Sequence, residues 1–464
     1  MGIILSEGQI VTPGETIKAD IRIEGEVIQA IGKNIKSEKN DEVINVKGCY
    51  ILPGGVETHT HFYLGAGAST TADDFKTGTL AAIIGGTTTI LDFATQERGK
   101  TLEEALDIWH EKADNVSFCD YGFHMAITDW NEQTSKSMEN MIKNGISSFK
   151  MYMAYKGTLQ VNDSEIYEAL KRSAEVNGII GFHCENGDII DELVKENIKK
   201  GLVQPKYHEK SRPSILEAEA ISRVSKIASI AKAPLYVVHL SSKEGYKEAL
   251  KARENGVDIY LETCPQYLLL DKSKYEGTKK DSFDGAKYIM SPPLRNKEDN
   301  EVLWKGIESD DIKIIGTDHC SFTYEQKKKG INDFSKIPNG GPGVEHRILL
   351  MYQYGVVEKR FSINKLSEIV STNAAKMFGM YPKKGIIKCG SDADLIVLNP
   401  NKSFIITNEN QHQNLDYTFY NGYKIDCNID YVFLRGKNIV KDNKLVESMA
   451  KGKYVKRNCF KTKY

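Results

Sequence analysis

The sequence predicts an α/β protein, a (β/α)8 TIM-like barrel with a second, smaller β-sandwich domain formed by both chain ends. Two observations predict this fold. Apolar, strand-like runs alternate with longer amphipathic segments through the middle of the chain, and runs that alternate apolar and polar residues stand at both ends. Alternating strands and helices favour a parallel sheet, and eight such units are typical of a closed barrel rather than an open sheet.

The strand-like runs of the middle region share an apolar character. They are Tyr50 to Phe62, Thr87 to Ala94, Tyr121 to Ile127, Ser147 to Tyr155, Ile179 to Glu185, Pro234 to Ser241, Asp258 to Thr263 and Ile312 to His319. We therefore assign residues 53–379 to the barrel. Active sites of such barrels lie at the C-terminal ends of the strands, so polar residues that end these runs are the candidates for function.

The two chain ends are expected to form one β-sandwich. Asp20 to Ile28 alternates apolar and polar side chains around a glycine, which is typical of a hairpin. Asp394 to Leu398 and Tyr431 to Val440 show the same alternation. We assign residues 1–52 and 380–464 to this second domain, and we expect the basic segment Lys451 to Arg457 to be a solvated end.

Composition excludes several classes of function. The 464 residues include 62 basic and 63 acidic side chains, and the net charge of -1 gives no basic patch for nucleic acid. No run approaches the ~20 apolar residues of a membrane span. Eight scattered cysteines without a C-x-x-C pair, and a start without a signal peptide, indicate reduced thiols. We expect a cytoplasmic protein whose partner is a small molecule, not a nucleic acid or a membrane.

The pair His59 and His61 follows directly after an apolar run. Side chains two apart on a strand point to the same side, so two imidazoles converge on one ion. Neutral imidazole is the commonest metal ligand in proteins. An isolated H-x-H pair occurs about as often in a polar turn, so the metal interpretation depends on further residues.

Four further residues of this kind lie on or at the end of later strand-like runs. Lys150 lies in the fourth run, His183 and His239 end the fifth and sixth, and Asp318 follows Ile314 to Thr317 in the eighth. A lone histidine at such a position is more often a hydrogen-bonded core residue. Six such groups at strand ends predict a metal centre.

Two other histidines are assigned to the core. His319 alternates to the opposite side of the strand from Asp318, and His124 ends the third run. We expect both to be structural, with a contact to a metal ligand as the alternative for His319.

The donor set divides into two metal sites, with His59, His61 and Asp318 on one ion and His183 and His239 on the other. Two dications repel an ammonium, so Lys150 is expected to be a neutral amine. Such an amine takes up carbon dioxide as a carbamate, whose two oxygens serve one metal each. An ordinary ion-paired barrel lysine is the alternative.

The chain resembles the cyclic amidohydrolases, and within them the dihydropyrimidinase and D-hydantoinase family, over essentially its whole length. The motifs that carry the resemblance are Pro53 to His61, Ala72 to Phe75, Gly85 to Thr89, Ser148 to Lys150, Phe182 to Asn186, Val238 to Ser241, Glu262 to Leu268, Met290 to Arg295 and Gly316 to Cys320.

The resemblance implies a cofactor and roles for further residues. It implies two zinc ions, with other divalent metals such as manganese as alternatives, bridged by carboxylated Lys150 and a hydroxide. It also implies that Tyr155 polarises the substrate carbonyl, and that Ser291 and Asn339 meet a cyclic amide mainly through backbone atoms. Members of the family suggest a homotetramer.

The hypothesis for the reaction is hydrolytic ring opening of a 5,6-dihydropyrimidine or a 5-substituted hydantoin to an N-carbamoyl amino acid. The metals lower the pKa of a bridging water from ~15.7 toward ~7. Asp318 takes the proton of that water and delivers it to the leaving nitrogen, while Tyr155 stabilises the oxyanion. A rim aromatic that covers the barrel mouth is the alternative for Tyr155.

Two alternative functions are weighed against this hypothesis. Dihydroorotases usually carry arginine after the H-x-H pair and allantoinases asparagine, whereas this chain has Phe62 and Tyr63. The apolar segment Phe62 to Ala68 favours an uncharged ring, but it departs from the Pro-Phe-rich loop common in the family. Dihydrouracil, alkyl hydantoins and aryl hydantoins therefore stay open as substrates, as does another cyclic ureide in a phenylhydantoinase- or allantoinase-like enzyme.

A non-enzymatic assembly protein like the collapsin response mediators is disfavoured, because those relatives lack the metal ligands that are all present here.

Overall fold

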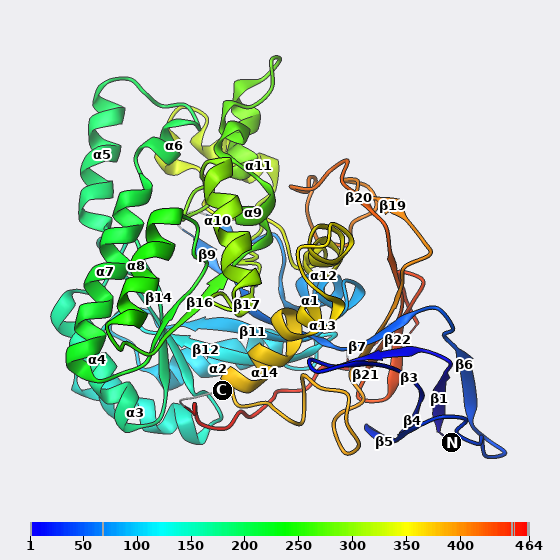
Figure 1. The fold of residues 1–464 in the computed structure, drawn as a ribbon. Helices are drawn as coiled ribbons and strands as arrows, with labels where there is room; N and C mark the ends of the chain where they lie inside the picture. The colour runs from blue at the N-terminus through cyan, green and yellow to red at the C-terminus, as the bar shows by residue number, and fades with distance from the viewer. Residues whose placement is uncertain (1, 67–68, 447–448, 450, 462–464) are drawn as a thin grey trace.

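A computed structural model describes residues 2–66, 69–446, 449 and 451–461 of the chain (Figure 1). Gly67 and Ala68, which belong to the predicted apolar segment after the H-x-H pair, lie outside the described residues. None of the described helices combines the length and the apolar character that crossing a membrane requires.

Eight parallel strands form the barrel, in the order in which they occur along the chain. They are β8 (Gly55–Thr60), β11 (Thr87–Thr95), β12 (Asp120–Ala126), β13 (Ser148–Tyr152), β14 (Ile179–His183), β15 (Leu235–Val237), β16 (Ile259–Thr263) and β17 (Ile314–Ile315). The first and last strands meet where His61 N–H donates to the His319 carbonyl at 2.8 Å and His319 N–H donates to the His59 carbonyl at 3.2 Å. The predicted fold class is confirmed, because the structure has a nearly closed barrel of eight parallel strands and separate strand-rich sheets.

Helices cover the outside of the barrel and connect successive strands (Figure 1). Several begin with the side-chain caps that satisfy free backbone N–H groups at a helix start, such as Thr101 with Glu104 and Asn162 with Glu165. The helices before β17 are α1 (Phe75–Ile84), α2 (Leu102–Ala113), α3 (Glu132–Lys143), α4 (Asp163–Glu175), α5 (Gly187–Lys199), α6 (Tyr207–Lys210), α7 (Ser214–Ala231), α8 (Lys243–Glu254), α9 (Pro265–Leu269) and α10 (Lys297–Glu308). Those after it are α11 (Tyr324–Lys327), α12 (Arg347–Met351), α13 (Ile363–Ser367) and α14 (Asn373–Met377).

The predicted first strand, Tyr50 to Phe62, is wrong in one respect, because it is two strands in different sheets. β7 (Tyr50–Pro53) pairs with strands of the chain ends, and β8 then enters the barrel. The chain crosses between the sheets at Gly54, whose N–H donates to the Asp394 carbonyl at 2.8 Å. A Cβ atom at Gly54 would lie 2.1 Å from Thr88 Oγ1, so only glycine allows this close approach.

Both chain ends contribute to the strand-rich part of the molecule. A four-stranded sheet contains β5 (Val27–Gly32), β4 (Asp20–Glu24), β1 (Ile3–Ser6) and β6 (Glu42–Asn45). A seven-stranded sheet contains β23 (Lys444–Leu445), β22 (Lys437–Lys441), β21 (Asn428–Leu434), β18 (Leu395–Asn399), β7, β2 (Gln9–Val11) and β3 (Thr16–Lys18). The predicted limits of the two domains, at residues 52 and 380, stay a prediction.

Alternation along the seven-stranded sheet explains how it packs on both sides. Ile51 and Val397 belong to a core with the four-stranded sheet, whereas their neighbours Leu52 and Ile396 belong to the large core that includes the barrel. Successive side chains of a strand point to opposite faces, so one strand serves two cores. This arrangement fixes the chain ends against the barrel.

A buried ion cluster lies between the barrel and the strand-rich part. Lys384 Nζ lies 2.7 Å from a carboxylate oxygen of Asp120, 3.1 Å from one of Asp392 and 2.6 Å from one of Asp394. The three carboxylates alone resemble a cation site. Lys384 already occupies the space between them, and Arg435 also pairs with Asp120, so the protein itself supplies the cations that these carboxylates face.

We expect Lys384→Met to lower the free energy of unfolding by about 3–5 kcal/mol, because it leaves buried carboxylates without their cation. Denaturant unfolding followed by circular dichroism measures the change. Lys402→Met is the matched control, since Lys402 pairs with Asp430 at 2.7 Å but is half exposed, and its loss should change stability by about 1 kcal/mol or less. Equal losses of stability in the two variants would contradict the role of Lys384 as the cation that pairs with the buried carboxylates.

The expectation that Lys451 to Arg457 is a solvated end is wrong. Tyr121 N–H donates to the Lys453 carbonyl at 3.1 Å, and Val455 N–H donates to the Tyr121 carbonyl at 2.7 Å. Arg457 is buried and donates from Nη1 to the Ser148 hydroxyl at 2.8 Å. The segment runs beside β12 of the barrel and is held there by these backbone hydrogen bonds. Its charged sequence gives no sign of them.

Candidate metal centre

The structure brings all six predicted ligand residues together at the C-terminal ends of the barrel strands. His59 lies on β8 with His61 directly after it, Lys150 lies on β13, His183 ends β14, and His239 and Asp318 follow β15 and β17. All but Asp318 are buried, and Asp318 is only slightly exposed. This is the end of a barrel at which active sites are built.

The donor atoms of these residues lie within contact distance of one another. His59 Nε2 lies 2.9 Å from Lys150 Nζ and 3.2 Å from Asp318 Oδ1, and His61 Nε2 lies 3.1 Å from the same oxygen. On the other side, His183 Nδ1 lies 3.1 Å from His239 Nε2. Ligand atoms of His59, His239 and Asp318 all lie within 4.8 Å of one another, which is a spacing that a metal ion can bridge.

The protonation of the cluster fits metal binding. Burial lowers the pKa of His59, His183 and His239, so these imidazoles are neutral and offer lone pairs. Burial also lowers the pKa of Lys150 to about 8. Burial opposes ionisation of Asp318, but His59, His61 and Lys150 lower the pKa of that carboxyl below its ordinary value. The residues present therefore fit divalent metal ions.

Backbone geometry at the site is also unusual. Tyr155, His239 and Asp318 adopt positive φ angles of 69°, 40° and 52°. Residues other than glycine rarely occupy this region, and such strain is concentrated at functional sites. The turns that end β13, β15 and β17 thus aim these side chains into the barrel mouth.

Two buried carboxylates fix the orientation of the histidines. Glu262 at the end of β16 lies 2.7 Å from His59 Nδ1, and Glu185 lies 2.7 Å from His183 Nε2. These contacts leave His59 Nε2 and His183 Nδ1 facing the centre. Burial raises the pKa of Glu185, but Arg212, 2.5 Å away, and His183 together lower it to about 2. Such outer carboxylates set the tautomer of a metal ligand.

We expect Glu262→Gln to weaken metal binding by about 10- to 100-fold. Glu262 accepts hydrogen bonds from the hydroxyls of Thr58 and Tyr236, each at 2.5 Å, and the amide group of glutamine cannot accept all of these bonds. Metal content after dialysis against a graded series of chelator measures the change. Glu301→Gln, at an exposed carboxylate of α10, is the control, and wild-type affinity in Glu262→Gln would contradict the role.

The three predicted substrate-contact residues lie beside the ligand cluster. The Ser291 hydroxyl donates to Asn339 Oδ1 at 3.0 Å, which links two segments far apart in the sequence. The Tyr155 ring lies 5.1 Å from the His183 ring, centroid to centroid. Burial raises the pKa of Tyr155, against a smaller opposing effect of Arg212 and a hydrogen bond with Ser291, so the hydroxyl keeps its proton and can donate it.

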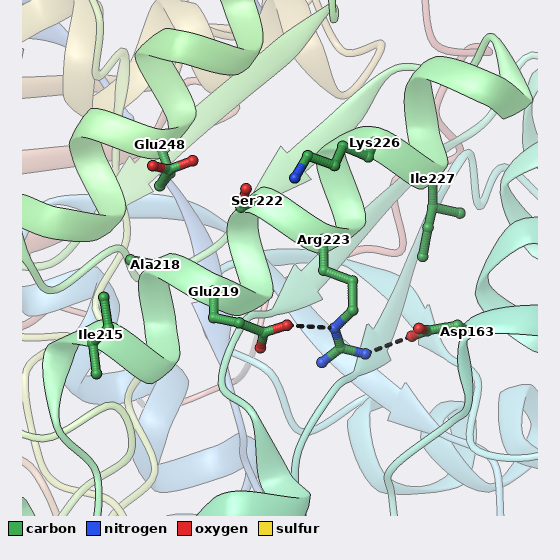
Figure 2. Close-up of a pocket in the computed structure, with 9 residues that line it drawn as sticks. All are labelled: Asp163, Ile215, Ala218, Glu219, Ser222, Arg223, Lys226, Ile227 and Glu248. Carbon is green, nitrogen blue, oxygen red and sulfur yellow. Dashed lines mark hydrogen bonds and ion pairs between the residues drawn. The ribbon is translucent and has the colours of Figure 1, made fainter.

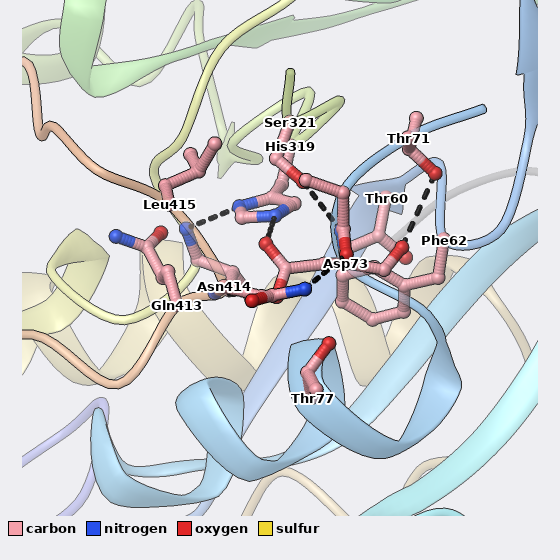
Figure 3. A network of polar contacts seen from close by, with 12 residues as sticks. Thr60, Phe62, Thr71, Asp73, Thr77, His319, Ser321, Gln413, Asn414 and Leu415 are labelled. Carbon is pink, nitrogen blue, oxygen red and sulfur yellow. Dashed lines mark hydrogen bonds and ion pairs between the residues drawn. The ribbon is translucent and has the colours of Figure 1, made fainter. Parts of the chain in front are cut away.

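The loop that follows the H-x-H pair is held by Asp73 (Figure 3). Its carboxylate lies 3.0 Å from His319 Nε2 and accepts a hydrogen bond from the Asn414 N–H at 2.9 Å. His319 Nδ1 accepts from the N–H groups of Gly343 and Val344 at 3.2 and 3.3 Å. His319 is therefore structural and points away from the ligand cluster, as the alternation along the strand predicts.

His124 likewise belongs to the core. Its ring nitrogens contact the Ser148 hydroxyl at 2.5 Å and the Thr58 carbonyl at 3.1 Å.

Several residues that support the site were not singled out from the sequence. Glu57 accepts hydrogen bonds from the N–H groups of His59 and Thr317 at 2.8 and 3.0 Å and lies 3.0 Å from Arg347 Nε. Burial raises the pKa of Glu57 to about 7, although Arg347 opposes that change. Three of the supporting carboxylates interrupt or end apolar strands, namely Glu57, Glu185 and Glu262. A carboxylate at such a position is the sequence signal that could have identified them.

A groove on the outer surface differs in character from the ligand cluster. It is a groove of about 480 Å³ on α4, α7 and α8 (Figure 2). Arg223, its central cation, lies 2.9 Å from Glu219 and 2.5 Å from Asp163. These three charged side chains are therefore paired with one another.

Comparisons with known proteins agree with this geometry. The model of the amidohydrolase family matches residues 50–439. The chain is 41% identical to a D-hydantoinase of Geobacillus stearothermophilus, covering 98% of this chain and 96% of the relative, and 38% identical to a D-phenylhydantoinase of Escherichia coli, covering 99% of each. The crystal structure of dihydropyrimidinase from Brevibacillus agri matches with a TM-score of 0.97 at 40% identity, with all of both chains covered. The chain therefore belongs to the amidohydrolase family, a metal-dependent family, and within it to the group of D-hydantoinases and dihydropyrimidinases.

Proposed function

We propose that this enzyme opens the ring of a cyclic amide, a 5,6-dihydropyrimidine or a 5-substituted hydantoin, by hydrolysis to an N-carbamoyl amino acid. The single observation that carries the proposal is the convergence of four imidazoles, a lysine and a carboxylate beside Tyr155, Ser291 and Asn339. Relatives named D-hydantoinase and dihydropyrimidinase support the same reaction.

The ligand residues would hold two zinc ions, with manganese as a possible replacement. His59, His61 and Asp318 would hold one ion, His183 and His239 the other, and a carbamate formed from Lys150 and carbon dioxide would bridge them. The lowered pKa of Lys150, about 8, supports this step because only the neutral amine reacts with carbon dioxide. When bound, such a metal pair supplies Lewis acidity and a water of pKa near ~7.

The residues of the chain carry the remaining tasks. The Tyr155 hydroxyl donates a hydrogen bond to the ring carbonyl oxygen, where negative charge develops. Asp318, ionised at neutral pH because its pKa is lowered, accepts the proton of the attacking water at its carboxylate and delivers it to the leaving ring nitrogen. Backbone groups at Ser291 and Asn339 orient the cyclic amide.

The alternative functions are weaker on the residues present. A non-enzymatic assembly protein has no need for six metal-ligand side chains, and all six face one another here. An allantoinase-like enzyme is not supported by Phe62, which lies in the core with no exposed surface and offers no polar anchor next to His61.

The experiment that tests the proposal is a substrate panel. Zinc-loaded protein is incubated with dihydrouracil, hydantoin, 5-phenylhydantoin, allantoin and dihydroorotate, and the product masses are measured. Opening of dihydrouracil or the hydantoins, with allantoin and dihydroorotate unchanged, is the expected result. Opening of allantoin alone would replace the proposal with the other cyclic ureide, and no opening with two metals bound would overturn it.

We further propose a homotetramer in the cytoplasm. The family resemblance supports the tetramer, and light scattering of the purified protein tests it. All eight cysteines are free thiols, which supports a reducing compartment.

A further inference from the structure

Lys327 is a buried lysine that takes no part in the metal centre. It is the last residue of α11 and has no exposed surface. Its ammonium group donates three hydrogen bonds, to the carbonyls of Ile289 at 2.8 Å, Pro338 at 2.6 Å and Gly340 at 2.7 Å. An ammonium group has three donors, so this set of carbonyls satisfies it completely.

The three carbonyls belong to the two segments that carry the proposed substrate contacts. Ile289 lies two residues before Ser291, and Pro338 and Gly340 flank Asn339 on either side. Gly340 N–H also donates to the Ile289 carbonyl at 3.0 Å. Lys327 is therefore a cross-link between the two segments.

Burying a cation at this position costs free energy. This cost indicates that the cross-link has a function. Burial lowers the pKa of Lys327 to about 7. Within the described ranges no carboxylate pairs with it. A buried charge without a counter-ion is retained only where hydrogen bonds replace its water, and the three carbonyls do so here.

The segments also keep backbone groups free for a ligand. Among the described residues, the N–H and carbonyl of Ser291 and the N–H of Asn339 make no hydrogen bond to other groups of the protein. The Ile289, Pro338 and Gly340 carbonyls are turned to Lys327 instead. A cyclic amide, with its N–H donors and carbonyl acceptors, matches such free backbone groups.

We propose that Lys327 is a positioning residue that sets the distance between the Ser291 and Asn339 segments and thereby the affinity for the cyclic amide. This inference rests on the proposed function. It adds a residue that touches neither substrate nor metal and acts through the two backbone segments.

The test compares Lys327→Met with Lys328→Met in the zinc-loaded enzyme. Methionine keeps the apolar stem and removes all three hydrogen bonds, while Lys328 is exposed and pairs with Glu325 at 2.9 Å. For a ring that the wild-type enzyme opens, we expect Lys327→Met to raise KM at least tenfold, with kcat changed less than threefold and metal content unchanged. Lys328→Met should match the wild type. A wild-type enzyme that opens no ring at all refutes the proposed function rather than this role.

A second variant covers the case in which Lys327→Met does not fold. Lys327→Gln keeps two N–H donors on a shorter side chain, so we expect a smaller rise in KM at wild-type metal content. Either a wild-type KM in the folded variants, or a loss of metal and kcat with KM unchanged, would overturn the positioning role.

Discussion

Lys150→Ala is expected to abolish ring opening, with a loss of activity on the order of 10³-fold or more, and to reduce the metal content of the chain. Lys150 Nζ lies 2.9 Å from His59 Nε2 at the centre of the ligand cluster and is fully buried. Removing Lys150 takes away the proposed bridge between the metals. The metals contribute several kcal/mol of transition-state stabilisation. Each ~1.4 kcal/mol lost lowers the rate tenfold. Metal analysis and the ring-opening assay measure both effects.

Lys143→Ala, at an exposed position at the end of α3, controls for the loss of a lysine from the barrel. A small carboxylate added to Lys150→Ala should restore part of the activity, because it can occupy the vacated space and offer two oxygens. Full activity and full metal content in Lys150→Ala would refute the bridge.

Tyr155→Phe is expected to lower kcat by about 10²- to 10³-fold, the usual cost of losing one hydrogen-bond donor to a developing oxyanion. Burial raises the pKa of Tyr155, so the hydroxyl is protonated when it is needed. The ring remains, so its contact with His183 and the metal content should be unchanged. Steady-state kinetics with metal analysis separates these effects.

The matched control is Tyr246→Phe, which removes a hydroxyl that donates to Asp311 at 2.7 Å on the outside of the barrel. That change should cost about 1 kcal/mol of stability and leave kcat unchanged. If Tyr155→Phe retained the wild-type kcat, Tyr155 would have no catalytic role and would be a rim aromatic that covers the barrel mouth.

The barrel strands and the clustering of the candidate ligands could be predicted because one rule places them. A parallel strand ends at the same edge as its neighbours, so a polar residue that ends an apolar run must lie at the barrel mouth. His59, His183 and His239 satisfy this rule, and the structure brings them together. Pattern alone was enough here because burial on both faces makes these runs almost continuously apolar.

The parts that could not be predicted depend on contacts between distant segments. The break between β7 and β8 depends on the close packing of Gly54 against Thr88, and an apolar run gives no sign of it. The position of Lys451 to Arg457 depends on backbone bonds with Tyr121. Glu262 and Lys327 act through groups that lie far along the chain, so their partners appear only when the chain is folded.

The measurement that tests the central claim most directly is a zinc titration of chelator-treated protein, with ring opening of a hydantoin as the readout. The metal-free protein should be inactive, and activity should rise with added zinc and saturate at two equivalents per chain, while Lys150→Ala fails to recover. Full ring opening by metal-free protein, or saturation without any dependence on Lys150, would contradict a metal centre built from His59, His61, Lys150, His183, His239 and Asp318.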